Sequence, residues 1–173
     1  MNATVERQRT NNDLCTPAVV LDLVRQLGRI ALDPCSNPWS EVGAGMTLDG
    51  TMLEEDGLLA DWGECVKMGG GGLVFVNPPY GRGELPKWAD KIASEARVDD
   101  LEIVALVPAS TDTRWWDVLR REATAIAYWC GRLKFGGGDH GAGTFGSAAF
   151  YFGKRRFLFA HLFDPHADVR VIG

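Results

Sequence analysis

The chain has 173 residues, of which 46% are hydrophobic and 24% charged, so it can bury one sizeable core but leaves little material for a second. The formal net charge of −5 weighs against a nucleic-acid partner without excluding one, because basic residues can still gather on one face. No apolar run is long enough to span a membrane, and the four cysteines are too widely spaced for a zinc knuckle. We therefore expect a cytoplasmic protein with no membrane and no metal partner, built from a flexible polar arm at 1–13 and one domain at 14–173.

Apolar periodicity predicts the helices and strands. A first helix begins at Thr16, a candidate cap, and Pro17, which suits a first turn, and it ends at Gly28. The later segments are strands at 30–32, 73–76, 101–107 and 123–129, helices at 84–97 and 112–121, and a final strand, helix and strand at 148–152, 155–163 and 169–172. Helical geometry predicts that only one of the adjacent Trp115 and Trp116 faces the core.

This alternation of strands and helices favours an α/β fold. Its sheet should be mostly parallel, with helices on both faces and an antiparallel finish at the C-terminus. In such a sheet, ligands bind beyond the carboxyl ends of the strands. Residues that directly follow a predicted strand are therefore the candidates for a functional site.

The sequence LVFVNPPYG at 73–81 carries the strongest functional signal. Pro78 and Pro79 stiffen the loop after a buried strand and hold the Pro78 carbonyl in one direction. An adenine amine is a poor nucleophile, and it needs hydrogen-bond acceptors where its two hydrogens lie as the nitrogen becomes tetrahedral. Asn77 Oδ1 and the Pro78 carbonyl are such acceptors, and Tyr80 offers an aromatic face to a base flipped from a duplex. The alternative is a proline turn that only ends a strand.

Several stretches, all in one order, resemble the phage-type DNA adenine methyltransferases of the Dam family. They are CTP at 15–17, LDPCSNPWS at 32–40, DGLLADW at 56–62, VNPPYG at 76–81, LVPASTDTRWW at 106–116 and GRLKF at 131–135. The NPPY tetrapeptide alone marks only the amino-methyltransferases as a reaction class, whereas the upstream stretches make the resemblance more specific. The resemblance implies a single Rossmann-like methyltransferase domain that moves a methyl group from S-adenosylmethionine to the N6 amine of adenine in double-stranded DNA.

The resemblance also assigns the cofactor-binding residues. They are Thr16, Pro17, Asp33, Pro34, Cys35, Ser36, Asp49, Asp61, Trp62 and Asn77. Asp33 would take the cofactor's ammonium, Asp49 its ribose hydroxyls, and the Asp61–Trp62 pair its adenine. Each has a plainer alternative: Asp33 as a helix cap, Asp49 as a turn residue after a short strand at 45–48, and Trp62 as ordinary core.

The basic residues and loops form the expected DNA surface. We expect phosphate contacts from Arg82, Lys87, Arg114, Arg132 and Lys134, although solvated surface charge is the alternative for each cluster. Site specificity is expected to reside in the glycine-rich loop 136–146 and in the segment 37–45. The alternatives left open are methylation of cytosine N4, RNA or a glutamine amide, and a DNA-binding relic without turnover. The sequence leaves the oligomeric state open between a monomer and a weak homodimer.

Overall fold

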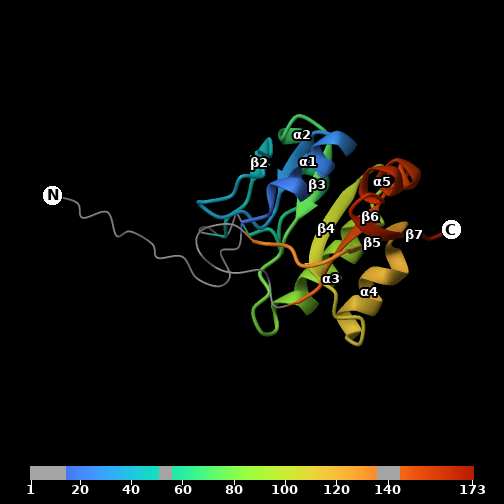
Figure 1. Cartoon of the computed structure of the whole chain (residues 1–173). Helices are drawn as coiled ribbons and strands as arrows, with labels where there is room; N and C mark the ends of the chain where they lie inside the picture. Colours follow the sequence, from blue (N-terminus) through green and yellow to red (C-terminus); the bar gives the residue numbers. More distant parts are fainter. Residues whose placement is uncertain (1–14, 51–55, 136–144) are drawn as a thin grey trace.

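Seven strands form one sheet in the part of the chain that the computed structural model describes, which is residues 15–50, 56–135 and 145–173 (Figure 1). In spatial order they are β2 (Met46–Thr47), β1 (Ile30–Asp33), β3 (Leu73–Val76), β4 (Ile103–Pro108), β6 (Ser147–Phe152), β5 (Ala125–Trp129) and β7 (Ala167–Val171). The pairs from β2 to β4 are parallel, whereas β6 is antiparallel to β4 and β5, and β7 is antiparallel to β5. The predicted mostly parallel sheet with an antiparallel C-terminal finish is confirmed.

Helices cover both faces of this sheet. One face carries α1 (Ala18–Leu27) and α5 (Arg156–Phe163), and the other carries α2 (Trp62–Met68), α3 (Glu84–Glu95) and α4 (Arg114–Glu122). A hydrophobic core lies on each face of the sheet, and alternate residues of a strand pack into one core or the other. In β3, Phe75 packs on the α1 side and Val76 on the α3 side. Burial on both faces explains why the central strands are continuous apolar runs in the sequence.

Strands β1 and β3 lie where the sheet changes its direction of winding. From β1 the chain passes to β2 on one side, whereas β3 and β4 lie on the other side. Loops that leave the carboxyl ends of two such strands diverge, and the crevice between them is where open α/β sheets bind ligands. Asp33 ends β1 and Asn77 directly follows β3, so both residues lie at this crevice.

Two local predictions are wrong. Thr16 does not cap α1, because the N-cap position is Pro17 without a side-chain cap, and the Thr16 hydroxyl accepts a hydrogen bond from Asn77 instead. Trp115 and Trp116 are both buried. The reason is that α4 packs against the sheet on one side and against α3 on another, so that neighbouring positions on the helix both face protein.

The sequence prediction also missed helix α2. Its start carries a recognisable signal, because the Asp61 side chain accepts a hydrogen bond from the Glu64 amide at 3.0 Å. An Asp followed three residues later by Glu is a common helix-start pattern. The helix has only seven residues and was too short for its periodicity to stand out.

Candidate active site

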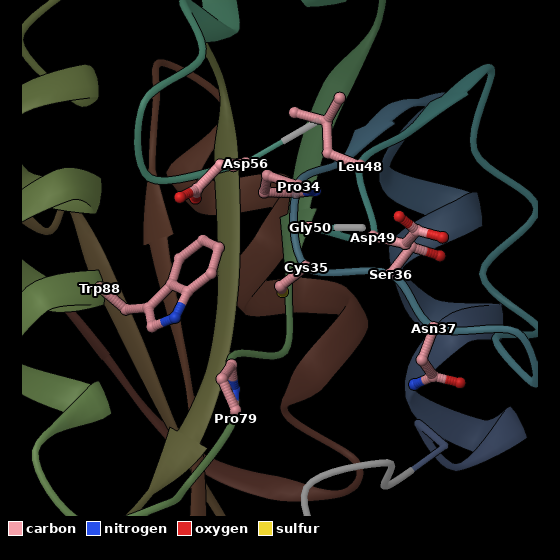
Figure 2. A pocket seen from close by; sticks show the side chains of 11 residues that line it. Pro34, Cys35, Ser36, Asn37, Leu48, Asp49, Gly50, Asp56, Pro79 and Trp88 are labelled. Carbon is pink, nitrogen blue, oxygen red and sulfur yellow. The ribbon is translucent and has the colours of Figure 1, made fainter. Parts of the chain in front are cut away.

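A cavity of about 180 Å³ opens at the crevice between β1 and β3 (Figure 2). Its lining comes from the loops after β1, β2 and β3, from the segment before α2, and from α3. The lining residues are Pro34, Cys35, Ser36, Asn37, Leu48, Asp49, Gly50, Asp56, Gly57, Pro79 and Trp88. A smaller polar pit beside it is lined by Cys15, Thr16, Asp33, Cys35, Asn37, Ser40, Val42 and Asn77. Because Cys35 and Asn37 line both hollows, the two form one continuous site.

Asp33 lies at the bottom of this site, 3% exposed. Its Oδ1 accepts a hydrogen bond from the Cys35 amide at 3.3 Å, and its Oδ2 accepts one from Ser40 Oγ at 3.1 Å. Burial raises the pKa of Asp33 to about 6, although these hydrogen bonds act in the opposite direction. The residues that follow form a turn instead of a helix, so the helix-cap alternative is excluded. A largely ionised, buried carboxylate at neutral pH is suited to a cationic ligand group.

The Cys35 thiol beside it is not an activated nucleophile. Burial raises its pKa well above the ordinary value, and the negative charge of Asp33 raises it further. The thiol is therefore protonated at neutral pH. Cys35 contributes shape to the cavity and no covalent chemistry.

The side chain of Asn77 is held by two hydroxyl groups. Its Nδ2 donates a hydrogen bond to Thr16 Oγ1 at 3.1 Å, and its Oδ1 accepts one from the Tyr80 hydroxyl at 2.7 Å. The same hydroxyl lies 3.3 Å from the Leu106 carbonyl on β4. Pro78 is buried behind this group, and Pro79 reaches the cavity wall. The loop after β3 therefore presents an oriented amide at the crevice.

The ring of Tyr80 packs inward, edge-on against two phenylalanines. The centroid distances are 6.0 Å to Phe135 and 5.5 Å to Phe145. Burial raises the pKa of the Tyr80 phenol, so it keeps its proton and can donate a hydrogen bond. The sequence predicted only an aromatic face here, and the use of the hydroxyl group was missed.

The expected adenine-binding pair at 61 and 62 lies outside the cavity. Trp62 is fully buried in the core and its Nε1 donates a hydrogen bond to the Gly57 carbonyl at 2.8 Å, while Asp61 caps α2. The Trp62 indole therefore belongs to the core and does not line the cavity, and its role as a cofactor contact stays a prediction. The physical reason is that Trp62 begins a helix whose inner face packs on the sheet, which turns the indole into the core.

A different tryptophan supplies the aromatic wall. Trp88 of α3 lines the cavity across from Asp49 and Ser36 (Figure 2). Gly57 beside it approaches the loop after β1 so closely that an added Cβ would lie 1.8 Å from the Pro34 carbonyl oxygen. In the sequence, Gly57 stood out only as part of the DGLLADW stretch. Trp88 was not predicted as a site residue, because the apolar pattern of 84–97 did not distinguish it from core residues.

The predicted DNA-contacting residues follow β3, β4 and β5 and share one edge of the sheet with Asn77. Arg82 follows β3, Arg114 begins the helix after β4, and Arg132 and Lys134 follow β5; all four are exposed. None of the four has an ion-pair partner within the described residues, whereas Lys87 pairs with Glu84 at 3.0 Å. The structure thus brings these four cations to the edge of the sheet that carries Asn77, which we call the active edge. Loop residues 136–144 lie outside the described part.

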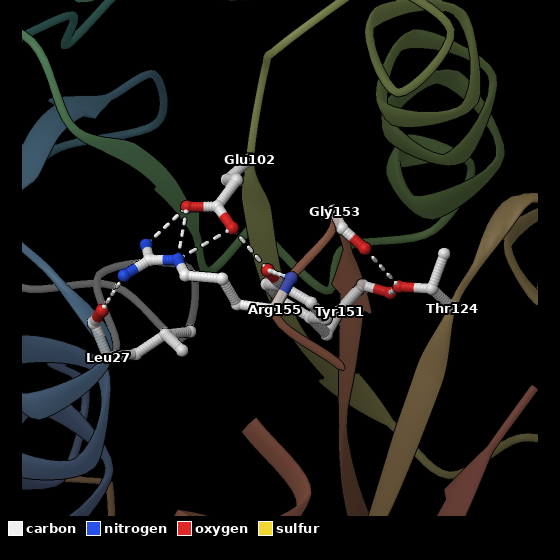
Figure 3. Close-up of polar contacts among 6 residues, drawn as sticks. All are labelled: Leu27, Glu102, Thr124, Tyr151, Gly153 and Arg155. Carbon is white, nitrogen blue, oxygen red and sulfur yellow. Dashed lines mark hydrogen bonds and ion pairs between the residues drawn. The ribbon is translucent and has the colours of Figure 1, made fainter. Parts of the chain in front are cut away.

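The basic run 154–156 lies at the opposite edge and is engaged in structural contacts. Figure 3 shows those of Arg155. Arg155 pairs with Glu102 and donates from Nη1 to the Leu27 carbonyl at 2.6 Å, which ties the start of β4 to the end of α1. The Tyr151 hydroxyl also donates to Glu102. Burial works to raise the pKa of Glu102, but the hydrogen bonds from Arg155 and Tyr151 prevail and lower it.

A family model described as DNA N-6-adenine-methyltransferase (Dam) matches residues 5–151. The chain belongs to this family. In this Dam-family chain the matched segment contains every site residue named above, whereas α5 and β7 lie beyond it. The comparisons with curated proteins and with solved structures gave no significant match.

None of the helices in the described residues is long and apolar enough to cross a membrane. No group of three or more His, Cys, Asp or Glu side chains there is arranged to hold a metal ion.

Proposed function

We propose that this chain transfers a methyl group from S-adenosylmethionine to the exocyclic N6 amine of adenine in double-stranded DNA. The observation that carries the proposal is the position of the Asn77 amide beside the buried Asp33 carboxylate at the β1–β3 crevice, in a chain of the Dam family. The first residue suits a target amine and the second suits a cationic cofactor.

The donor set of the cavity fits S-adenosylmethionine. Asp33 would hold its ammonium group, Asp49 its ribose hydroxyls, and Trp88 with Asp56 its adenine. Thr16 closes the pit next to Asp33 and Asn77, and Pro17 exposes the first amides of α1 nearby. When bound, the cofactor supplies an electrophilic methyl group on a sulfonium.

The loop after β3 prepares the attacking amine. Asn77 Oδ1 and the Pro78 carbonyl would accept the two amine hydrogens, which turns the nitrogen lone pair toward the methyl group. Proximity of the two reactants in a site shielded from water supplies much of the remaining rate. No covalent enzyme intermediate is needed, in keeping with the protonated Cys35 thiol.

The cations at the active edge would hold the DNA. Arg82, Arg114, Arg132 and Lys134 are exposed on the side from which a flipped base must enter. They supply a local positive surface despite the net charge of −5.

The deciding experiment offers tritiated S-adenosylmethionine and unmethylated double-stranded DNA to the purified chain. Digestion of the product to nucleosides, followed by mass analysis, should reveal N6-methyladenine. N4-methylcytosine would change the acceptor base, and label only in RNA or protein controls would change the substrate class. A folded chain that binds the cofactor without transferring label would favour a DNA-binding relic.

A further inference from the structure

We propose that Thr16 and Tyr80 are positioning residues that orient the side-chain amide of Asn77 from its two ends. This inference rests on the proposed function. Thr16 Oγ1 receives the Asn77 Nδ2 hydrogen bond at 3.1 Å, and the Tyr80 hydroxyl donates to Asn77 Oδ1 at 2.7 Å. Thr16 is 6% exposed and precedes α1, so the contact joins residues 61 positions apart.

Orientation matters because the two ends of a carboxamide have opposite roles. Oδ1 accepts hydrogen bonds and Nδ2 donates them, so a half-turn of the amide of Asn77 would present a donor to a target amine that also donates. The terminal torsion of an asparagine side chain has a broad, nearly two-fold preference and does not select one orientation by itself. Two hydroxyl groups on separate parts of the fold supply that selection.

The position of the Tyr80 hydroxyl is fixed by its ring, which packs edge-on against Phe135 and Phe145. The Leu106 carbonyl of β4, at 3.3 Å, is a more distant acceptor for the single hydroxyl proton than Asn77 Oδ1 at 2.7 Å. An amide oxygen can accept two hydrogen bonds, so donation from Tyr80 does not by itself exclude the target amine from Asn77 Oδ1. The two hydrogen bonds that Asn77 makes with Thr16 and Tyr80, which we call the clamp, can therefore persist while the substrate is bound.

The test compares Thr16→Val with Thr16→Ser, which keeps the hydroxyl, and adds Tyr80→Phe, which keeps the ring. We expect Thr16→Val and Tyr80→Phe each to lower kcat on the order of tenfold, the value of one hydrogen bond, with little change in KM for DNA. Thr16→Ser should retain nearly the parent kcat. A loss confined to KM, or an equal loss in Thr16→Ser, would show that Thr16 does not position Asn77.

The sharpest control is Asn77→Asp, because a carboxylate presents an oxygen at both ends and has no wrong orientation. Adding Thr16→Val to Asn77→Asp should change kcat by less than about twofold, against roughly tenfold in the parent. An equal tenfold loss in both backgrounds overturns the clamp. If the parent transfers no methyl group, the proposed function fails. The contact between Thr16 and Asn77 is then tested by thermal unfolding of Thr16→Val, Asn77→Ala and their double variant. Additive losses of stability would show that the two side chains are not coupled.

A separate observation concerns β7, and we infer that it pairs with β7 of a second copy of this chain. β7 is the last strand in the order of the described sheet. On its inner side Cys130 donates to the His166 carbonyl at 3.0 Å, and Ile172 donates to the Thr124 carbonyl at 2.9 Å. Hydrogen-bonded positions alternate along an antiparallel strand, so the amides and carbonyls of Ala167, Val169 and Val171 point away from β5.

The sequence of this edge complements itself. Antiparallel pairing about Val169 places Asp168 opposite Arg170 of the second copy, and the two-fold axis repeats that opposite-charge pair. Apolar side chains flank the edge, because Val171 is 38% exposed and Phe157, on the helix packed against β7, is 70% exposed. A second copy satisfies the outward backbone groups and covers these side chains together.

Sedimentation of the full chain across a dilution series tests the pairing, with a dimer expected at high concentration. Val169→Pro removes an outward amide without touching a hydrogen bond to β5, and it should give a folded monomer. Arg170→Asp should also give a monomer because it sets Asp168 against a like charge. Adding Asp168→Arg to Arg170→Asp restores opposite charges and should restore the dimer. A monomeric parent, or dimers in both single variants, would overturn the inference.

Discussion

The Nδ2 of Asn77 lies 3.1 Å from Oγ1 of Thr16, which connects the loop after β3 to the segment before α1. A residue near the start of the Dam-matched segment thus meets one from its middle at the same crevice. The hydroxyl that the sequence suggested as a helix cap instead holds the amide to which we assign the chemistry.

Asn77→Ala should lower methyl transfer by a hundredfold to a thousandfold, as an order of magnitude for one lost transition-state hydrogen-bonding group. Cofactor affinity should change much less than the rate, because Asn77 lines only the small pit and the larger cavity is lined by other residues. Tritiated methyl incorporation at saturating cofactor measures the rate, and thermal melting checks the fold. A folded Asn77→Ala protein that works at the parent rate would refute the role of the amide.

Much of the fold could be predicted because burial on both faces makes the central strands continuous apolar runs. Leu73–Val76 was predicted with its observed bounds for this reason. Side-chain direction in the short α2 could not be predicted, since it depends on which helix face meets the sheet. The sequence therefore did not show that Trp62 lies in the core, whereas Trp88, 26 positions further on, lines the cavity. The contact between Thr16 and Asn77 also has no local signal, because it depends on how α1 docks.

Trp88→Ala should weaken S-adenosylmethionine binding, by about 1–3 kcal/mol if the indole stacks on the cofactor's adenine. Isothermal titration calorimetry measures the affinity directly. Trp62→Phe is the matched control, because it alters a buried tryptophan outside the cavity and should lower the melting temperature more than the affinity. If Trp62→Phe weakened binding and Trp88→Ala did not, Trp62 would be the residue that contacts the cofactor's adenine.

Asp33 should make cofactor binding depend on pH. Its pKa of about 6 in the folded chain lies above the ordinary 3.8, so the carboxylate becomes protonated as pH falls through 6. Affinity for a cationic group should then fall by up to roughly tenfold per pH unit below that point. Asp33→Asn should bind weakly at every pH, and calorimetry between pH 5 and pH 8 would reveal an equally steep profile if another group were responsible.

The same shift predicts a change in stability. Because the pKa of Asp33 is raised in the folded chain, the neutral carboxyl group contributes to the free energy of unfolding. This contribution is fully present below pH 4 and is lost as pH rises through 6. At pH 7 the buried charge costs on the order of 3 kcal/mol before a cation binds. Asp33→Asn should therefore melt at a higher temperature than the parent at pH 7 and lose this advantage near pH 4. An unchanged difference across that window would argue against a raised pKa.

Neutralising the cations of the active edge should weaken DNA binding in a salt-dependent way. Arg114, Arg132 and Lys134 are exposed and follow β4 and β5, on the edge that carries Asn77. Each cation that contacts a phosphate releases about one counterion, so its change to Gln should reduce the slope of log K against log salt by roughly 0.9. Lys154→Gln is the matched control, since Lys154 is also exposed but lies at the opposite edge, paired with Asp100. Fluorescence anisotropy with a labelled duplex, at four or more salt concentrations, gives the slopes. If Lys154→Gln reduces the slope while the three active-edge variants do not, DNA approaches the other edge of the sheet and the proposed entry route for the flipped adenine is wrong.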